Sequence, residues 1–354
     1  MLFQPKDHLV GLDLGSSFIK VAELRKKGKG DEYVLKKFGV VPIPIGSIVD
    51  GRIEDMKTIA EAIATLFKTN KIREKNVAIA TGGYSVIVKT INMARATEEE
   101  LQDQIYAEAE QYIPYDIEEV NIDYQVLGES DFSPEQISVL LVAVKRDLVA
   151  EYIDLINMAG LNPCIIEVDT FALQNIYERL PNISEDKVSM LVDVGVSKTS
   201  LNIVRGGTSL MMRDNGNGIA QIRDEIAAEA ECSEEEAETI IAEQKSDLLS
   251  VEEIREITLG IIDEWCADIY GMVSTFRSKS KNDDVELVFL TGGGALIKGF
   301  PEALASELNT SVSILNPFEG IEYDEKRIPE ETIDELAPLV SIAIGLGLRR
   351  VDDK

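Results

Sequence analysis

Two hydrophobic periods alternate along this chain. Apolar runs of strand length, continuous or alternating, occupy 9–25, 33–41, 76–81, 137–144, 165–168, 190–194, 199–205, 208–213 and 285–290. Between them lie segments whose apolar residues recur every three or four positions, at 54–69, 97–113, 147–159, 169–180, 216–284 and 334–350, with one more beginning near Phe300. The first period predicts β-strands and the second predicts amphipathic helices. Their alternation predicts an α/β fold.

Turn and cap signals place several boundaries. Thr97 and Glu100 have the spacing of a capping box, which predicts that a helix begins there. Gly206-Gly207 predicts a tight hairpin between two strands. The polar run at 25–32 predicts a second hairpin turn.

Composition narrows the class of protein. The 354 residues are 45% hydrophobic, enough for a large core and for more than one domain. The 35 Lys+Arg and 64 Asp+Glu leave a formal net charge of −29, which disfavours nucleic acid and anionic lipid as partners of the surface as a whole but does not exclude a local basic patch. The chain has no secretory leader and no apolar run of about 18–20 residues, so we expect a soluble, cytoplasmic protein.

Residue types exclude several chemistries. His8 is the only histidine, which removes multi-histidine metal sites and, unless His8 itself serves, Ser-His-Asp triads. The three cysteines, Cys164, Cys232 and Cys266, contain no CxxC pair, so we expect neither a disulfide framework nor a zinc cluster. No GxxxxGK[ST] motif occurs, which excludes a P-loop.

One stretch is strongly acidic. Residues 97–136 contain thirteen acids and no base. Two interpretations are open: a solvated helix face followed by a loop, or a docking surface for a partner.

The most informative feature is an internal repeat. GLDLGSSFIKVAEL (11–24) and LVDVGVSKTSLNIV (191–204) share an apolar strand, an aspartate, one spacer, a glycine, a small polar stretch and a second strand. The two aspartates, Asp13 and Asp193, are 180 residues apart. A unit of three strands that occurs twice, with helices after each copy, predicts two similar α/β halves that face each other.

The residue types of the repeat point to a metal-bound polyphosphate. An aspartate at the end of a strand can hold the water shell of Mg²⁺, an ion that takes few protein ligands. The glycine lets the backbone approach an anion, and the polar stretch offers hydroxyl and backbone N–H donors to phosphate oxygens. LTGGGALIKGF (290–300) adds a strand that runs into a glycine triplet, where missing side chains would let a base and ribose lie on the backbone. A tight strand-to-helix turn is the alternative.

These segments resemble the actin-like ATPase superfamily. GLDLGSSFIK is similar to its first phosphate motif, LVDVGVSKTS to its second, LTGGGALIKGF to its adenosine motif and IAIGLGLRR (342–350) to its closing helix. Within the superfamily, the chain resembles the PilM family of type IV pilus assembly proteins through EEELQDQIYAEAEQYIPYDIEEVNIDYQVLG (98–128) and VAVKRDLVAEYIDLINMAGLNPCIIEVDTFAL (142–173). The likeness covers about residues 8–350.

The resemblance implies an actin-like ATPase fold, an α/β architecture of two lobes that each contain a mixed sheet, with the 1C insert that the cell-division relative FtsA also has. It implies subdomain 1A at 1–84, 165–188 and 339–354, subdomain 1C at 85–164, subdomain 2A at 189–215 and 285–338, and subdomain 2B at 216–284. FtsA carries an amphipathic membrane helix after its closing helix, and the final LRRVDDK does not resemble one.

The resemblance also implies a site for ATP and Mg²⁺. Asp13 and Asp193 would orient the waters of the metal. The residues implied to line the phosphates are Gly15, Ser16, Ser17, Lys20, Gly195, Ser197, Lys198 and Thr199, and those implied at the nucleoside are Gly292, Gly293, Gly294 and Glu238. Lys20 equally suits a solvated lysine on the exposed face of the sheet, and for Glu238 an ordinary solvated side chain is the favoured interpretation. Hydrolysis needs a group that positions the attacking water, for which Glu167 and Asp169 are the candidates by location, and we expect any turnover to be slow.

Finally, the resemblance implies a partner. PilM proteins bind the N-terminal cytoplasmic segment of the inner-membrane protein PilN, in a groove formed by the first lobe and its insert. The chain would then lie at the inner membrane through its partner, as a homo-oligomer or ring in contact with other pilus components. Two alternatives stay open: an FtsA-like or other filament-forming actin homologue, and a small-molecule kinase of the same superfamily.

Overall fold

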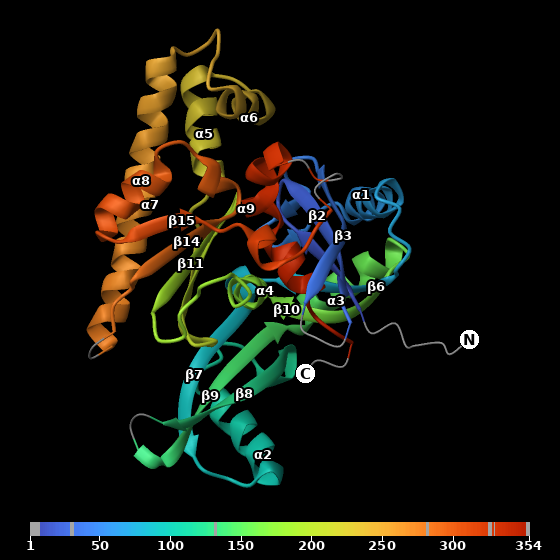
Figure 1. Ribbon diagram of the computed structural model, residues 1–354, viewed down its shortest axis with the longest axis vertical. Helices are drawn as coiled ribbons and strands as arrows, with labels where there is room; N and C mark the ends of the chain where they lie inside the picture. Colours follow the sequence, from blue (N-terminus) through green and yellow to red (C-terminus); the bar gives the residue numbers. More distant parts are fainter. Residues whose placement is uncertain are drawn as a thin grey trace.

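The computed structural model describes residues 8–28, 32–130, 133–280, 283–324, 328 and 330–351. It consists of two lobes and a smaller sheet that projects from the first lobe (Figure 1). Residues 29–31 of the basic turn expected at 25–32, and residues 352–354 after the closing helix, lie outside the described residues.

The first lobe is built on a five-stranded sheet with the order β10-β6-β1-β2-β3. Strand β2 is antiparallel to both β1 and β3, whereas β6 is parallel to β1 and β10 is parallel to β6. The strands are β1 (Val10–Leu14), β2 (Phe18–Lys26), β3 (Tyr33–Pro42), β6 (Asn76–Thr81) and β10 (Asn162–Val168). A short hairpin adds β4 (Ile48–Val49) and β5 (Arg52–Ile53).

Helices cover both faces of this sheet because its strands are apolar on both faces. Helices α1 (Met56–Thr69) and α3 (Arg146–Met158) pack on one face, where Val10 and Leu12 share a core with Ile63 and Leu155. Helices α4 (Asp169–Tyr177) and α9 (Glu330–Gly347) pack on the other face.

The second lobe repeats the strand plan of the first. Its sheet has the order β13-β12-β11-β14-β15, in which the first three strands are antiparallel neighbours and β14 is parallel to β11 and to β15. The strands are β11 (Ser189–Val194), β12 (Thr199–Arg205), β13 (Thr208–Asn215), β14 (Leu287–Thr291) and β15 (Ser311–Ile314). The internal repeat predicted from the sequence is therefore confirmed as two sheets with one topology.

The helices of the second lobe are α5 (Ile219–Ala230), α6 (Glu234–Glu243), α7 (Val251–Lys279) and α8 (Phe300–Leu308). On one face of the sheet, Met190 and Val192 share a core with Trp265 and Phe300. On the other face, Leu191 belongs to the core that holds α4 and α9. These two helices therefore lie between the sheets and join the lobes (Figure 1).

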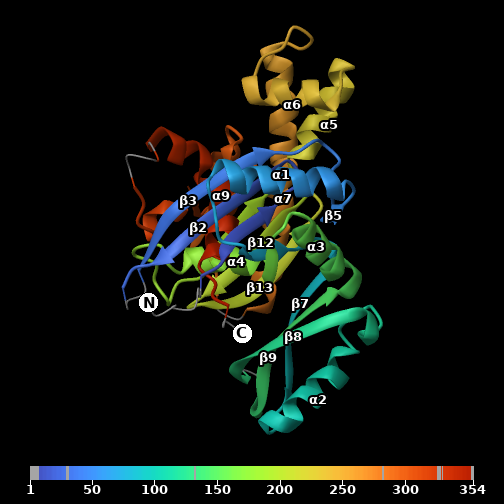
Figure 2. The same ribbon diagram turned by 90° about the vertical axis from the view of Figure 1, so that its right-hand side faces the viewer.

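The projecting insert is a three-stranded sheet with the order β7-β9-β8 and one covering helix (Figure 2). Its elements are β7 (Val86–Ala94), α2 (Glu98–Ala109), β8 (Val120–Ser130) and β9 (Ser133–Lys145). The capping box predicted at Thr97 and Glu100 is confirmed, since each side chain accepts from the backbone N–H of the other. Among the described residues, short 3-10 helices also occur at Gly83–Ser85, Ile117–Glu119, Gly293–Leu296 and Pro317–Gly320.

Three expectations change. Part of the acidic stretch that we interpreted as helix and loop is strand β8, because Val120, Ile122 and Tyr124 face the core of the insert between exposed polar residues. Residues 146–164, expected in the insert, pack with the first lobe through α3 and β10. The closing helix spans Glu330–Gly347 instead of 334–350. Within the described residues, no helix is both long and apolar enough to cross a membrane.

Candidate functional site

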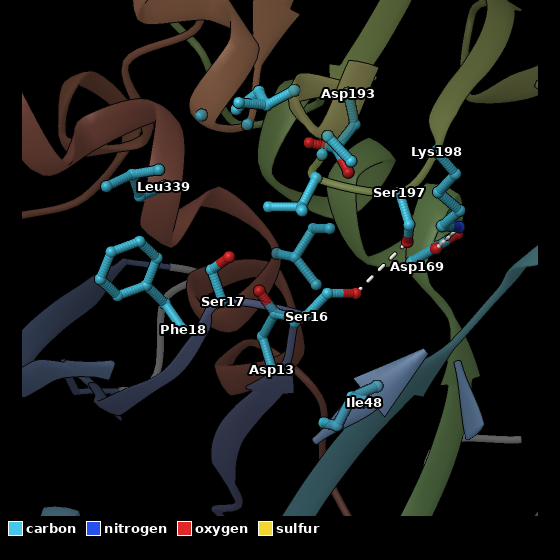
Figure 3. Close-up of a pocket in the computed structure, with 18 of the residues that line it drawn as sticks. Asp13, Ser16, Ser17, Phe18, Ile48, Asp169, Asp193, Ser197, Lys198 and Leu339 are labelled. Atoms are coloured by element: carbon cyan, nitrogen blue, oxygen red, sulfur yellow. Dashed lines mark hydrogen bonds and ion pairs between the residues drawn. The ribbon is translucent and has the colours of Figure 1, made fainter. Parts of the chain in front are cut away.

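A cavity of about 470 Å³ lies where the two lobes meet. The β1–β2 turn of the first lobe and the β11–β12 turn of the second lobe both line it (Figure 3). The same hydrogen bond closes both turns: the Gly15 N–H donates to the Phe18 carbonyl at 3.1 Å, and the Gly195 N–H donates to the Lys198 carbonyl at 2.9 Å. The two copies of the repeat therefore match down to their turn geometry.

The tips of the two turns meet inside the cavity. The hydroxyl oxygens of Ser16 and Ser197 lie 3.3 Å apart, and Ser17 lines the cavity beside them (Figure 3). Hydroxyl groups from both lobes are thus gathered at one place. Their role as phosphate ligands stays a prediction.

Asp13 and Asp193 line the same cavity, so the two aspartates of the repeat do share one cleft. The Asp13 carboxylate is paired with Lys20 Nζ at 3.0 Å. At the matching register position of the second lobe, Asp193 faces Ser200 and has no such lysine opposite it on the strand. Burial, and then the negative charge of Asp169, raise the pKa of Asp193 to about 7. A carboxyl group in this setting favours either a proton or a nearby cation.

Lys198 reaches from the second lobe to the first. Its ammonium group forms an ion pair with Asp169, the first residue of α4, and donates to Ser200 Oγ at 2.9 Å. Asp214, near the end of β13, lies 3.9 Å from the same nitrogen and accepts the N–H of Gly83 at 2.9 Å. Burial opposes the charge of Lys198, but the surrounding carboxylates outweigh it and its pKa is raised. Two polar contacts therefore hold the lobes together at this edge of the cavity.

The glycine triplet closes the cavity on the side of the second lobe. Gly292 has a φ of +79°, and a Cβ there would lie 2.4 Å from the Val194 carbonyl oxygen and 2.5 Å from Asp193 Oδ1. A Cβ on Gly294 would lie 2.2 Å from Val194 Cγ1. The missing side chains thus make room for the end of β11. Gly292 and Gly293 also line the cavity, and a base and ribose lying on them stays a prediction.

Three predicted site residues do not line the cavity, namely Glu167, Thr199 and Gly294. The Glu167 carboxylate pairs with Arg349 Nη1 at 3.0 Å. Thr199 is buried, and its hydroxyl donates to the Asn217 carbonyl at 2.8 Å. These positions do not support water positioning by Glu167 or phosphate binding by Thr199. Of the two acidic candidates, only Asp169 lines the cavity.

The second lobe also supplies an apolar wall. Ile219, Ile241 and Leu296 line the cavity together with Leu339 from α9. Glu238 of α6 lines it as well, and burial raises the pKa of its carboxyl group. The cavity therefore has a polar end at the two turns and a largely apolar end at α5, α6 and α9.

Some lining residues were not indicated by the sequence analysis. Gly82 follows β6, which is parallel to β1, and the ends of parallel strands meet at one sheet edge. The glycine pair that ends β6 was the signal that could have found it. Asp214 and Arg223 carry no local signal, because only the placement of β13 and α5 brings them to the cavity.

Two lobes of one strand order, with a hairpin from each entering a shared cavity, define the actin-like ATPase class of folds. The family model described as type IV pilus assembly protein PilM matches residues 11–351, and the chain belongs to this family.

Solved structures agree with this assignment. The protein in a structure described as a PilM-PilN type IV pilus biogenesis complex is 25% identical, with a TM-score of 0.87 over 99% of this chain and 100% of that chain. The ethanolamine utilization protein EutJ from Carboxydothermus hydrogenoformans is 15% identical, with a TM-score of 0.57 over 98% of this chain and 90% of that chain. A diol dehydratase-reactivating factor is 10% identical, with a TM-score of 0.56 over 96% of this chain and 99% of that chain. The last two show the fold alone.

Proposed function

We propose that this chain binds ATP with Mg²⁺ in the cavity between its lobes and holds the N-terminal cytoplasmic segment of PilN, as a platform for type IV pilus assembly. The proposal that the cavity binds ATP rests on one observation. Asp13 and Asp193 line one cavity, with the hydroxyl-bearing turns of both lobes beside them. Membership of the PilM family and the likeness to a PilM–PilN complex support the pilus part.

The residues present fit a magnesium ion. Asp13 and Asp193 offer two carboxylates. Burial first, and the negative charge of Asp169 second, raise the pKa of Asp193, and a cation beside this carboxylate would favour its charged form. Across the part of the chain that the structure describes, no three His, Cys, Asp or Glu side chains form a metal cluster. Magnesium suits such a sparse site because it keeps several waters. When bound, it would neutralise charge on the phosphate oxygens.

The polar and apolar ends of the cavity suit the two ends of ATP. Ser16 and Ser197 would donate to phosphate oxygens, and Lys20 would contribute positive charge. The nucleoside would pack on the apolar wall that contains Ile219, where Glu238 would accept a hydrogen bond from a ribose hydroxyl.

Hydrolysis, as we propose it, is slow and depends on Asp169. This carboxylate begins α4 at the cavity. Burial raises the pKa of Asp169, and the ion pair with Lys198 opposes that shift and favours the charged form, which accepts a water O–H. The same ion pair occupies one side of the carboxylate and limits its freedom to act as a base, which is a reason to expect low turnover.

The partner segment would dock between the first lobe and the insert. Strands β7 and β9 connect these two bodies, and the acidic residues of 97–136 belong to the insert. An acidic surface attracts the lysines and arginines that flank a membrane span. Burial of one or two apolar side chains would add roughly 1.5–3 kcal/mol each before ordering costs.

Two separate measurements test the two parts. Calorimetric titration with ATP, in Mg²⁺ or in EDTA, should show binding that Mg²⁺ strengthens. Capture on an immobilised peptide of the PilN N-terminus should retain the protein, whereas a scrambled peptide of equal charge should not. Equal capture by both peptides, or by neither, would reject the partner assignment and leave the nucleotide site unaffected.

A further inference from the structure

An ion pair in the cavity joins residues of different lobes. Lys198 belongs to the β11–β12 turn of the second lobe, and its ammonium group pairs with the carboxylate of Asp169, the first residue of α4 (Figure 3). Both residues line the cavity, and the lysine side chain is 27% exposed. A ligand in the cavity can therefore reach the ammonium group from the side that faces away from Asp169.

Both oxygens of the Asp169 carboxylate are engaged in this arrangement. Oδ1 accepts the Thr170 N–H at 2.7 Å, and Oδ2 accepts a hydrogen bond from the Lys198 ammonium group. Of the two acidic candidates for water positioning, Asp169 is the one that lines the cavity, so Lys198 holds an oxygen that such a role would use. Release of Lys198 opens Oδ2 to a water, whereas Oδ1 and its backbone donor stay in place.

The end of β6 leaves space for this ion pair. A Cβ on Gly82 would lie 2.0 Å from Asp169 Oδ2 and 2.5 Å from Lys198 Nζ. The φ of Gly82 is −163°, an extended conformation that any residue adopts, so space and not backbone strain requires glycine here. The ion pair thus fills the place of a side chain at the junction of the lobes, and the contact depends on a specific feature of the neighbouring strand.

The carboxylates beside Lys198 each keep a backbone donor if the lysine moves away. Asp214, which lies 3.9 Å from Lys198 Nζ, accepts the Gly83 N–H at 2.9 Å. Asp169 keeps the Thr170 N–H and stands at the N-terminus of α4, where the helix dipole favours a negative charge. A carboxylate that retains such donors loses less on separation from its cation than one buried without them.

A phosphate group can take the place of Asp169 as the partner of Lys198. Ser197 precedes the lysine in the turn, and its hydroxyl lies where we place phosphate oxygens, 3.3 Å from Ser16 Oγ. A lysine carries its charge and three donors on a flexible four-carbon stem, so the ammonium group can move between acceptors while its backbone stays in the turn. ATP brings several negative charges to the cavity, whereas Asp169 offers one.

We propose that Lys198 regulates the cavity by exchanging partners. It pairs with Asp169 until ATP binds, and it then transfers to a phosphate oxygen of the ATP and leaves Asp169 Oδ2 open to water. This inference rests on the proposed nucleotide site and adds its regulation, because the ion pair both competes with ATP and restrains Asp169 until ATP displaces it. The alternative is a static brace, in which Lys198 keeps Asp169 as its partner whether or not ATP is bound.

The two possibilities differ in the sign of one measurement, the affinity for ATP in Mg²⁺ by calorimetry. Asp169→Asn removes the competitor of the phosphates, so the exchange predicts binding at least about threefold tighter than in the wild type. Lys198→Gln removes the transferred cation and should weaken binding by at least about threefold. Adenosine, which has no phosphate, should bind Asp169→Asn and the wild type alike.

Removal of a negative charge near the phosphates raises affinity by itself, and two controls separate that effect from the exchange. Asp214→Asn removes an equal charge but leaves the ion pair between Lys198 and Asp169 in place, so its gain in affinity should be less than about half that of Asp169→Asn. In the Lys198→Gln background, Asp169→Asn should change the affinity by less than about twofold, because no lysine remains to be released.

Equal gains from Asp169→Asn in both backgrounds, or equal gains from Asp169→Asn and Asp214→Asn, would assign the effect to charge alone and overturn the exchange. If Lys198→Gln fails to fold, the comparison of Asp169→Asn with Asp214→Asn decides. A wild type that binds no ATP rejects the nucleotide site and the exchange together. A wild type that binds ATP at least as tightly as Asp169→Asn rejects the exchange alone and leaves the nucleotide site standing.

Discussion

Ser16 and Ser197 are 181 residues apart in the chain, yet their hydroxyl oxygens lie 3.3 Å from each other across the cavity. The contact is not between equivalent residues of the repeat, because Ser197 corresponds to Ser17 and Ser16 corresponds to Val196. The two hairpins therefore meet with an offset of one residue, which brings a hydroxyl group from each lobe to the same place.

If both hydroxyls donate to one polyphosphate, each should contribute to ATP affinity. We expect Ser16→Ala and Ser197→Ala each to weaken binding by about three- to tenfold, the range of a single hydrogen bond. The fold-loss of ATP affinity in the double variant should be smaller than the product of the two single fold-losses, since both hydroxyl groups contact one ligand. Calorimetry with ATP and Mg²⁺ measures this, and Ser274→Ala on the exposed face of α7 is the control. Unchanged affinity in both single variants would remove the phosphate from this position.

Asp193→Asn should act on stability and on metal binding in opposite directions. The pKa of Asp193 is raised from 3.8 to about 7, so the folded protein holds a proton there that the unfolded chain releases. Folding stability attributable to this group therefore falls as pH rises from about 4 to about 7 and is level above that range. Asparagine does not ionise, so the variant avoids the cost of a buried charge at this position. We therefore expect it to be more stable than the wild type by about 1–3 kcal/mol at pH 8 and by less at pH 5.

The same substitution should reduce the effect of Mg²⁺ on ATP affinity, because one of the two candidate carboxylates is gone. Unfolding in denaturant at both pH values measures the first effect, and titration with and without Mg²⁺ measures the second. Asp263→Asn, at an exposed site on α7, is the control. A stability gain that is equal at pH 5 and pH 8 would contradict the assignment of the titration to Asp193.

The ion pair between Lys198 and Asp169 should stabilise the closed arrangement of the lobes. Lys198→Gln leaves the carboxylates of Asp169 and Asp214 near each other without their shared cation. We expect a loss of about 1–3 kcal/mol in the free energy of unfolding, below the range of a fully buried pair because the lysine is partly exposed. Hydrogen exchange at the start of α4 should become faster.

Lys187→Gln is the matched control for that variant. Lys187 is paired with Glu286 at 3.9 Å on the surface, and such pairs contribute at most about 1 kcal/mol. Adding Asp169→Asn to Lys198→Gln should restore part of the lost stability, since it removes one of the unpaired charges. If the double variant is less stable than Lys198→Gln alone, repulsion between carboxylates is not the cause.

The parts of the fold that the sequence predicts are those with local signals. Asp13 and Asp193 lie near strand ends in two copies of one motif, and that repeated motif predicts a pair of facing hairpins. Strand β8 was missed because its acidic exposed residues hide the apolar alternation of Val120, Ile122 and Tyr124. The boundary at residue 164 was misplaced because nothing local shows that α3 packs on the first-lobe sheet.

In the candidate site, too, the sequence did not reveal positions that depend on contacts between distant segments of the chain. Glu167 and Asp169 both stand at the junction of β10 and α4, and only the pairing of Glu167 with Arg349 reveals which of them faces the cavity. The sequence alone could not show that Gly292 and Gly294 pack against Val194, because Val194 lies about 100 residues earlier in the chain. Asp214 depends wholly on tertiary structure, since its partners Gly83 and Lys198 come from different lobes.

Two helical glycines should respond to alanine in opposite ways. Gly345 lies in α9, and a Cβ there would sit 1.8 Å from the Ala172 carbonyl oxygen of α4. Gly345→Ala must push apart the two helices that join the lobes, so we expect a loss of about 2–4 kcal/mol in unfolding free energy. Gly260 lies exposed in α7 with nothing within 4 Å of such a Cβ. Gly260→Ala should therefore stabilise the protein by about 0.5–1 kcal/mol through helix propensity.

The two glycine variants also distinguish an effect on helix packing from an effect on ATP binding. Helix α9 lines the nucleotide cavity through Leu339, so a shift of α9 in Gly345→Ala should weaken ATP binding, whereas Gly260→Ala should leave it unchanged. Denaturant unfolding and ATP titration of both variants measure the two effects. If Gly345→Ala lost stability but kept full ATP affinity, the closing helix would be a structural brace between the lobes and not a wall of the site. If both alanines stabilised the protein, the close contact between α4 and α9 would itself be wrong, and with it the shared core that holds the two hairpins face to face.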